Sequence, residues 1–239
     1  MSGLATNPVE VARERAKILL SAGAGEACMT CSFQLEDMAV LDIVRAFAPR
    51  VPVLFLETGY HFAETYAYRD RMAREWNLNL VNLASAKSVA QQELEFGILY
   101  RSDPGRCCQL RKVEPLMAGL EPFDVWFTGL RREQSPTRRN LQVEEIHTLP
   151  NGKRLRKISL LAEWSWKEVE SYAVLRGIPP LPLYAQGYPS IGCEPCTQKP
   201  LDPSNPRSGR WSGEKLECGI HTFTAGPGAT GNDTTEGAK

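Results

Sequence analysis

Short apolar segments alternate with amphipathic segments through the first half of the chain, and this alternation constrains the fold more than any other feature. The apolar segments, interpreted as buried strands, are residues 27–32, 51–56, 78–83 and 124–128. The amphipathic segments, interpreted as helices, are residues 9–20, 36–47, 62–76, 89–96 and 107–116. Strands that alternate with helices form a parallel sheet with helices on both faces. The sequence therefore predicts an α/β fold with a doubly wound, mainly parallel sheet.

A different pattern follows the fourth predicted strand. Residues 143–149 and 155–158 flank Asn151-Gly152, a dipeptide typical of hairpin turns. A last helix is predicted at 166–176, with Ser165 as its N-cap. From residue 177 onward proline and glycine dominate, which predicts a long irregular C-terminal segment. We assign residues 1–222 to a single domain, and residues 223–239, which have almost nothing to bury, to a disordered tail.

The composition argues against several classes of protein. The 28 Lys and Arg residues balance 28 Asp and Glu residues, whereas nucleic-acid and membrane-surface binders usually carry a basic excess. No apolar run approaches the ~20 residues that span a bilayer. The N-terminus lacks the apolar core of a signal peptide. We therefore expect a soluble cytoplasmic protein without a nucleic-acid or membrane partner.

The turn after the first predicted strand is a candidate phosphate site. Residues 32–37 contain no glycine, so the turn is neither a Walker loop nor a dinucleotide fingerprint. The Ser32 hydroxyl and the amides of the following helix could still hold one phosphate. Glu36 and Asp37 suit the positive end of that helix and would repel a long polyphosphate. An ordinary helix capping box is the alternative interpretation.

Two further turns place polar groups at the same edge of the sheet. The second strand ends at Thr58-Gly59, and the loop after the fourth strand carries four arginines, namely Arg131, Arg132, Arg138 and Arg139. Because arginine binds phosphate or sulfate through two parallel hydrogen bonds, this loop favours anion binding over a solvated turn.

Four of the seven cysteines form two candidate ligand pairs. In a reducing compartment, clustered cysteines indicate metal binding or catalysis rather than disulfides. Cys193 and Cys196 form a C-x-x-C, whose two sulfurs can reach one metal or cluster. The tandem pair Cys107-Cys108 can also ligate if it lies at a helix N-terminus, where free amides favour anionic sulfur. Four thiolates fit tetrahedral zinc or a four-iron cluster, and their spacing does not decide between the two.

The other three cysteines receive separate interpretations. Cys28 and Cys31 lie three residues apart on a predicted strand, so their side chains point to opposite faces and cannot share a metal. We interpret both as small core residues. Cys218 lies alone between Glu217 and Gly219, and a nearby His or arginine-rich site could lower its pKa toward neutrality. This favours a nucleophile over an incidental thiol.

In combination, these motifs resemble those of a known family. They are SFQLEDM, LETG, CCQLRKVEPL, WFTGLRREQSPTRR, AEWSWKEVESY, QGYPSIGCEPCT, GRW and ECGIH, in order along most of the chain. The chain is similar to the assimilatory adenylyl-sulfate reductases, the cluster-containing branch of the adenylyl-sulfate and phosphoadenylyl-sulfate reductases. The fold implied by the resemblance is the adenine-nucleotide α-hydrolase-like (PP-loop) sheet shared with ATP pyrophosphatases.

The resemblance also implies a cofactor, a reaction and a partner. Cys107, Cys108, Cys193 and Cys196 would hold one [4Fe-4S] cluster. Cys218, in a catalytic segment at about residues 200–222, would attack the sulfur of adenylyl sulfate and expel AMP. Thioredoxin or a similar dithiol would then release sulfite from the cysteine S-sulfonate. The implied process is sulfate assimilation, and the oligomeric state, including a homo-oligomer, stays open.

The same resemblance assigns substrate-binding residues. Lys112 would lie between cluster and sulfate, Arg131 would meet the phosphosulfate, and Arg207 and Arg210 would close on the leaving charge. The full expected substrate-binding set is Ser32, Phe33, Glu36, Asp37, Thr58, Gly59, Lys112, Arg131, Arg207, Arg210 and His221.

Three alternatives stay open at this point. The nearest is a reductase of phosphoadenylyl sulfate or of both nucleotides, although members restricted to that substrate typically lack the two cysteine pairs. An ATP pyrophosphatase of the same fold would need a Gly-Gly-x-Asp-Ser type of loop, which residues 32–37 match poorly. A zinc-binding module would use the four cysteines structurally but would leave ECGIH and the arginine loop unexplained.

Overall fold

One mixed sheet organises the computed structural model, which describes residues 7–21, 23, 25–200, 202, 205–211 and 219–220. Within these residues the strand order is β3-β2-β1-β4-β6-β5. The strands are β1 (Ala27–Thr30), β2 (Pro52–Glu57), β3 (Asn79–Ala84), β4 (Val125–Thr128), β5 (Glu144–Thr148) and β6 (Arg154–Ser159). Only β5 pairs in the antiparallel sense, with β6, whereas all other pairs are parallel. The predicted doubly wound sheet and its hairpin extension are both confirmed.

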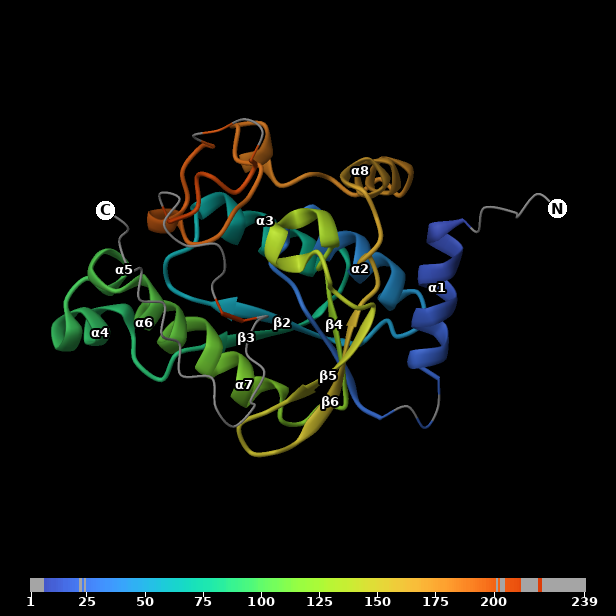
Figure 1. The fold of residues 1–239 in the computed structure, drawn as a ribbon, viewed down its shortest axis with the longest axis horizontal. Coiled ribbons are helices and arrows are strands. Elements are labelled where there is room, and N and C mark those ends of the chain that lie inside the picture. Colours follow the sequence, from blue (N-terminus) through green and yellow to red (C-terminus); the bar gives the residue numbers. More distant parts are fainter. Residues whose placement is uncertain are drawn as a thin grey trace, which may run out of the picture.

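Helices cover both faces of the sheet. The main helices are α1 (Pro8–Leu19), α2 (Leu35–Arg45), α3 (Ala63–Glu75), α4 (Val89–Phe96), α7 (Glu114–Leu120) and α8 (Trp166–Leu175). Figure 1 shows α2, α3 and α8 on one side of the sheet, with α6 (Pro104–Cys108) and α7 on the other. Two apolar clusters correspond to these sides, one built largely from α1, α2, α3 and α8, the other from α7. Local signals fix the helix starts, since Asn7 caps α1 and Ser165 caps α8, as predicted.

Cys28 and Cys31 lie on opposite faces of the sheet, as predicted. Cys28 packs in the cluster on the α7 side, whereas Cys31, one residue beyond the end of β1, packs in the cluster on the α2 side. Both thiols are buried, and burial raises the pKa of each well above its ordinary value. The pair therefore serves the core, and its two sulfurs do not share a site.

The helix that carries the tandem cysteines differs from its prediction. It begins at Pro104 rather than Cys107, widens into a π-helical turn at Gln109–Val113, and continues as α7 to Leu120. Pro115 gives a physical reason, because proline has no N–H to donate to the carbonyl of residue 111 and its ring crowds that carbonyl. The Cys107 amide already donates to the Asp103 carbonyl at 3.0 Å, so it is not a free helix-start amide.

Candidate functional site

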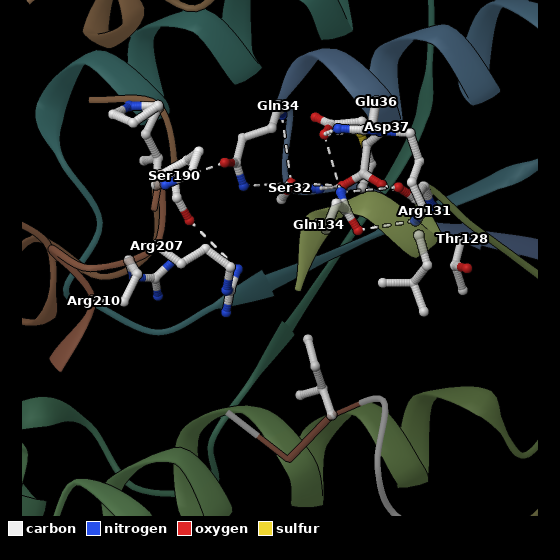
Figure 2. Close-up of a pocket in the computed structure, with 18 of the residues that line it drawn as sticks. Ser32, Gln34, Glu36, Asp37, Thr128, Arg131, Gln134, Ser190, Arg207 and Arg210 are labelled. Atoms are coloured by element: carbon white, nitrogen blue, oxygen red, sulfur yellow. Dashed lines mark hydrogen bonds and ion pairs between the residues drawn. The ribbon is translucent and has the colours of Figure 1, made fainter. Parts of the chain in front are cut away.

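A cavity of about 760 Å³ opens at the carboxyl ends of the central strands. Its lining includes the last residues of β1 and β4, Thr30 and Thr128, and the turns that follow them. The irregular segment 187–192 and residues 206–211 form the opposite wall. Ligands bind at this edge in open α/β sheets, because strand ends and helix N-termini meet there. The cavity is therefore the candidate substrate site (Figure 2).

Asp37 organises the turn after β1. Its carboxylate accepts hydrogen bonds from the Ser32 amide and hydroxyl, both at 2.6 Å, and from the Gly129 amide at 3.1 Å. A Cβ at position 129 would overlap Asp37, so the close approach of the two turns requires glycine there. Burial raises the pKa of Asp37 to about 6, although the hydrogen bonds from Ser32 oppose that shift. Asp37 thus joins the turns that follow β1 and β4.

Replacement of Asp37 by Asn is expected to lower the free energy of unfolding by about 1–3 kcal/mol, because an amide leaves one of the three donors without an acceptor. The folded-state pKa of about 6 lies above the ~3.9 of an unfolded aspartate, so the contribution of protonation is fully present below about pH 4. It is lost as the pH rises through 6. The stability advantage of the wild type over D37N, measured by urea unfolding, should therefore shrink from pH 4 to pH 7. An advantage that grows over that range would contradict the raised pKa.

Glu36 and Arg131 form a buried ion pair in the cavity wall. The Arg131 Nη2 lies 2.9 Å from Glu36 Oε1, and their side chains are 5% and 11% exposed. Arg131 also contacts Glu133 at 3.3 Å and donates to the Trp164 carbonyl. Gln134 donates a further hydrogen bond to Glu36 at 3.0 Å. Both residues of this pair line the cavity, so a carboxylate and its paired arginine share one part of the wall.

Cations gather at the other side of the cavity. Figure 2 shows Arg207 and Arg210 across the cavity from Glu36 and Arg131, and Lys112 also lines it. Arg207 donates to the Ser190 hydroxyl at 3.4 Å. Arg210 is buried and packs over the Trp211 ring at 4.6 Å. A Cβ at position 192 would overlap the Arg210 guanidinium, so the absence of a side chain at Gly192 leaves room for that guanidinium in its observed position.

The four paired cysteines line one small cavity. Cys107, Cys108, Cys193 and Cys196 meet there with Thr58, Arg111, Lys112 and Trp211. None of the four forms a disulfide among the described residues, and burial raises the pKa of Cys107 and of Cys196 to about 11. Across the described part of the chain, no group of three or more His, Cys, Asp or Glu is arranged to hold a metal ion. The four thiols share a cavity, but they do not converge on one point.

The two cavities are joined by Lys112 and by the turn after β2. Lys112, in the π-helical turn, lines both cavities. His61 pairs with Cys193 through an antiparallel bridge, and the Tyr60 carbonyl accepts from the Glu194 amide at 2.7 Å. The Thr58 hydroxyl lies 3.4 Å from the Cys193 sulfur. A shift in the position of the cysteines can therefore be transmitted to the substrate cavity through these few direct contacts.

The cavity gathers seven of the expected substrate-binding residues: Ser32, Glu36, Asp37, Lys112, Arg131, Arg207 and Arg210. Three others lie elsewhere. The Phe33 ring is fully buried in the core, Thr58 lines the cysteine cavity, and Gly59 packs near Val89 and Arg111. The expected nucleophile Cys218 and His221 lie outside the described residues.

Of the four loop arginines, Arg131 and Arg138 line the cavity. Arg132 instead donates to the Leu141 carbonyl and pairs with Glu163, and Arg139 is exposed.

Sequence reasoning missed several residues that shape the site. Gln34 accepts from the Ile191 amide at 2.9 Å and donates to the Ser32 hydroxyl at 3.1 Å, which connects the first turn to the C-terminal segment. Tyr184 accepts a hydrogen bond from the Leu35 amide. Neither contact has a sequence signal, since each joins residues more than a hundred positions apart.

No helix among the described residues is long and apolar enough to cross a membrane.

Comparison with known proteins gives consistent matches over most of the chain. Residues 26–199 match the model of the phosphoadenosine phosphosulfate reductase domain. The chain is 42% identical to the adenosine 5'-phosphosulfate reductase of Mycolicibacterium smegmatis, over 78% of this chain and 79% of that protein. It is 44% identical to the enzyme of the same name from Mycobacteroides abscessus, over 78% of each chain. The corresponding protein of Streptomyces coelicolor is 42% identical, over 81% of each.

Solved structures agree on the fold. A phosphoadenylyl-sulfate reductase from Candida auris superposes with a TM-score of 0.63 at 24% identity, covering 80% of this chain and 89% of that one. An FMN adenylyltransferase from Candida glabrata superposes with a TM-score of 0.59 at 13% identity, covering 84% and 70%. At these identities the likeness concerns the fold alone, and it is the PP-loop type of α/β sheet.

Proposed function

The chain belongs to the phosphoadenosine phosphosulfate reductase family, and from that premise we propose that it reduces adenosine 5'-phosphosulfate (adenylyl sulfate) to sulfite and AMP. It is an oxidoreductase that acts on sulfur in sulfate assimilation. The choice of substrate is supported by the distribution of charged side chains around the cavity. Arg207 and Arg210 at one side suit the phosphosulfate, and Glu36 at the other, where it is paired with Arg131, suits the hydroxyls of an unphosphorylated ribose.

The reaction proposed for this cavity has two steps. In the first, the Cys218 thiolate attacks the sulfate sulfur, the sulfur–oxygen bond to the phosphate breaks, and AMP leaves with that electron pair. In the second, one thiol of thioredoxin or a similar dithiol attacks the Cys218 sulfur and releases sulfite. The second thiol of the donor then frees Cys218, and the donor leaves as a disulfide, so the two electrons come from the donor.

The described residues supply binding and electrostatics. Lys112, Arg207 and Arg210 would neutralise the phosphosulfate oxygens, whose negative charge grows as AMP leaves. Ser32 and the amides after it would hold the nucleotide at the start of α2, with the Ser32 hydroxyl turning from Asp37 to the ligand. Arg131 stays paired with Glu36, so its charge is shared between that carboxylate and the ligand.

We propose that the four paired cysteines hold one [4Fe-4S] cluster. The donor set fits, because four cysteines outside any disulfide, three buried and Cys196 partly exposed, line one cavity beside Arg111 and Lys112, which would offset the charge of thiolate ligands. A single zinc ion needs every sulfur within ~2.3 Å of the metal, whereas a cluster binds one thiolate at each of four irons and so holds its ligands farther apart. When bound, the cluster would supply a fixed local charge beside Lys112.

The test is turnover with the two nucleotides, followed as sulfite release with a dithiol donor. Wild-type protein should prefer adenosine 5'-phosphosulfate over the 3'-phosphorylated nucleotide. Glu36→Gln should narrow that preference by about tenfold, because it removes a carboxylate that would repel a second phosphate across the low-dielectric cavity. The side-chain oxygen of the introduced glutamine can still accept a hydrogen bond from Arg131, so this part of the cavity wall keeps its structure. Equal use of both nucleotides by the wild type, or an unchanged preference in E36Q, would contradict the proposed specificity.

A further inference from the structure

Gln92 is a buried polar residue that the reaction does not use. It lies in the first turn of α4 and is 1% exposed. Its amide group lies between Cys107, the first of the tandem cysteines, and Arg111, four residues further along the chain. Arg111 Nη1 donates to Gln92 Oε1 at 3.2 Å, and Gln92 Nε2 donates toward the Cys107 sulfur at 4.0 Å. Both polar ends of this buried side chain therefore have a partner, as buried amides require.

The orientation of the Gln92 amide follows from chemistry. A guanidinium has only donors, so the group facing Arg111 must be the carbonyl oxygen. The Gln92 NH2 group then faces Cys107. Because this NH2 group can only donate, the Cys107 sulfur must be the acceptor. Arg111 itself is held firmly, because it is 4% exposed and donates to the Thr58 carbonyl and, at 3.2 Å, to the Lys87 carbonyl.

The backbone beneath Gln92 is equally constrained. Ser88 and Gln91 form a reciprocal capping box, with the Ser88 hydroxyl accepting from the Gln91 amide at 3.2 Å and Gln91 Oε1 accepting from the Ser88 amide at 2.9 Å. The Gln92 amide continues this turn by donating to the Ser88 carbonyl at 3.0 Å. These bonds fix the backbone that carries the Gln92 side chain before any ligand binds.

We propose that Gln92 is a positioning residue of the cysteine site, whose side-chain N–H donates a hydrogen bond to the Cys107 thiolate and tunes the cluster that Cys107 helps to hold. This inference rests on the proposed cluster. An N–H···S bond draws electron density from the sulfur, and hydrogen bonds to ligand sulfurs are among the factors that set the potential of an iron–sulfur centre. Removal of this bond should weaken retention of the cluster and shift its potential to a more negative value.

A purely structural role makes a different prediction. If Gln92 served only to anchor Arg111, a glutamate of the same length would anchor it at least as well, since a carboxylate is the stronger acceptor for a guanidinium. Glutamate cannot donate to sulfur when ionised. Gln92→Glu therefore keeps one contact and removes the other.

The experiment compares Q92E with Gln91→Glu in anaerobically purified full-length protein. Gln91 is exposed, adjacent and subject to the same chemical change, and glutamate preserves its capping box. We expect Q92E to lose iron to a chelator about tenfold faster than the wild type or more, as the loss of one hydrogen bond to a charged group implies. Its Fe–S(Cys) bands in resonance Raman should shift, whereas Q91E should match the wild type. Gln92→Met, which lacks both donor and acceptor, should also accelerate iron loss and keeps the test open if Q92E does not fold.

The outcomes separate the two proposals. If the purified wild-type protein contains neither iron nor inorganic sulfide, both the proposed cluster and the role of Gln92 are refuted. Wild-type protein with a cluster, and a Q92E variant that matches Q91E in iron loss and in its Raman bands, overturns the role of Gln92 alone.

Discussion

Replacement of Cys218 by Ser is expected to abolish the sulfonate adduct that wild-type protein forms with adenosine 5'-phosphosulfate in the absence of a reductant. A serine hydroxyl stays protonated at neutral pH, whereas a thiol with its pKa lowered by neighbouring cations supplies the anionic nucleophile. The measurement is the intact mass of anaerobically purified protein after one exposure to the nucleotide. Wild type should gain the mass of one SO3 group and the variant none, and steady-state sulfite release should fall to the background rate.

Cys31 provides the matched control for this experiment. Cys31 packs in the core but is also among the residues that line the substrate cavity, so position alone makes it a second candidate nucleophile. Burial and the nearby Asp37 carboxylate raise its pKa, however, which keeps it protonated and unreactive. Cys31→Ser should therefore still accept one sulfonate. An adduct that survives in C218S and disappears in C31S would transfer the chemistry to Cys31, and no adduct in the wild type would refute the covalent route.

Much of the fold could be predicted because its signals are local. The alternation of apolar and amphipathic segments fixed the parallel strands, Asn151-Gly152 marked the hairpin between β5 and β6, and capping residues marked the helix starts. The period of two along a strand also separated Cys28 from Cys31 correctly. Each of these inferences needed only residues close together in the sequence.

The parts that escaped prediction depend on contacts between distant residues. The sequence placed a phosphate loop at Ser32 but did not reveal that Gln34 connects it to Ile191, or that Glu36 is the partner of Arg131. Likewise, Gln92 lies in no motif, and Arg111, although it lies in CCQLRKVEPL, has no sequence signal for its contact with Gln92. The π-helical turn has a local cause in Pro115. A proline predicts that a helix is interrupted, but it does not predict whether the helix kinks, ends or widens into a π-helical turn.

Lys112→Ala is expected to slow sulfonation of Cys218 by about a hundredfold to a thousandfold while the protein keeps its iron. Lys112 is 8% exposed and lines both cavities, so in the proposed reaction its largely buried ammonium would lie close to the phosphosulfate, whose charge changes. Removal of one preorganised donor from such a site costs about 3–4 kcal/mol of transition-state stabilisation. The measurement is the single-turnover rate of the mass gain, with iron and sulfide determined on the same samples.

Two further variants show why position, and not charge alone, gives Lys112 this effect. Arg106→Ala removes an exposed cation from the same helical run, and it should leave the rate within about twofold because an exposed charge is screened by water. Lys112→Arg keeps the charge but places a larger, planar group in the wall, so its rate should lie between those of the wild type and K112A. The π-helical turn is central to this comparison, since it is the segment that carries Lys112 at the junction of the two cavities. A K112A rate close to that of the wild type, in protein with full iron content, would show that Arg207 and Arg210 neutralise the phosphosulfate without help from the cysteine side.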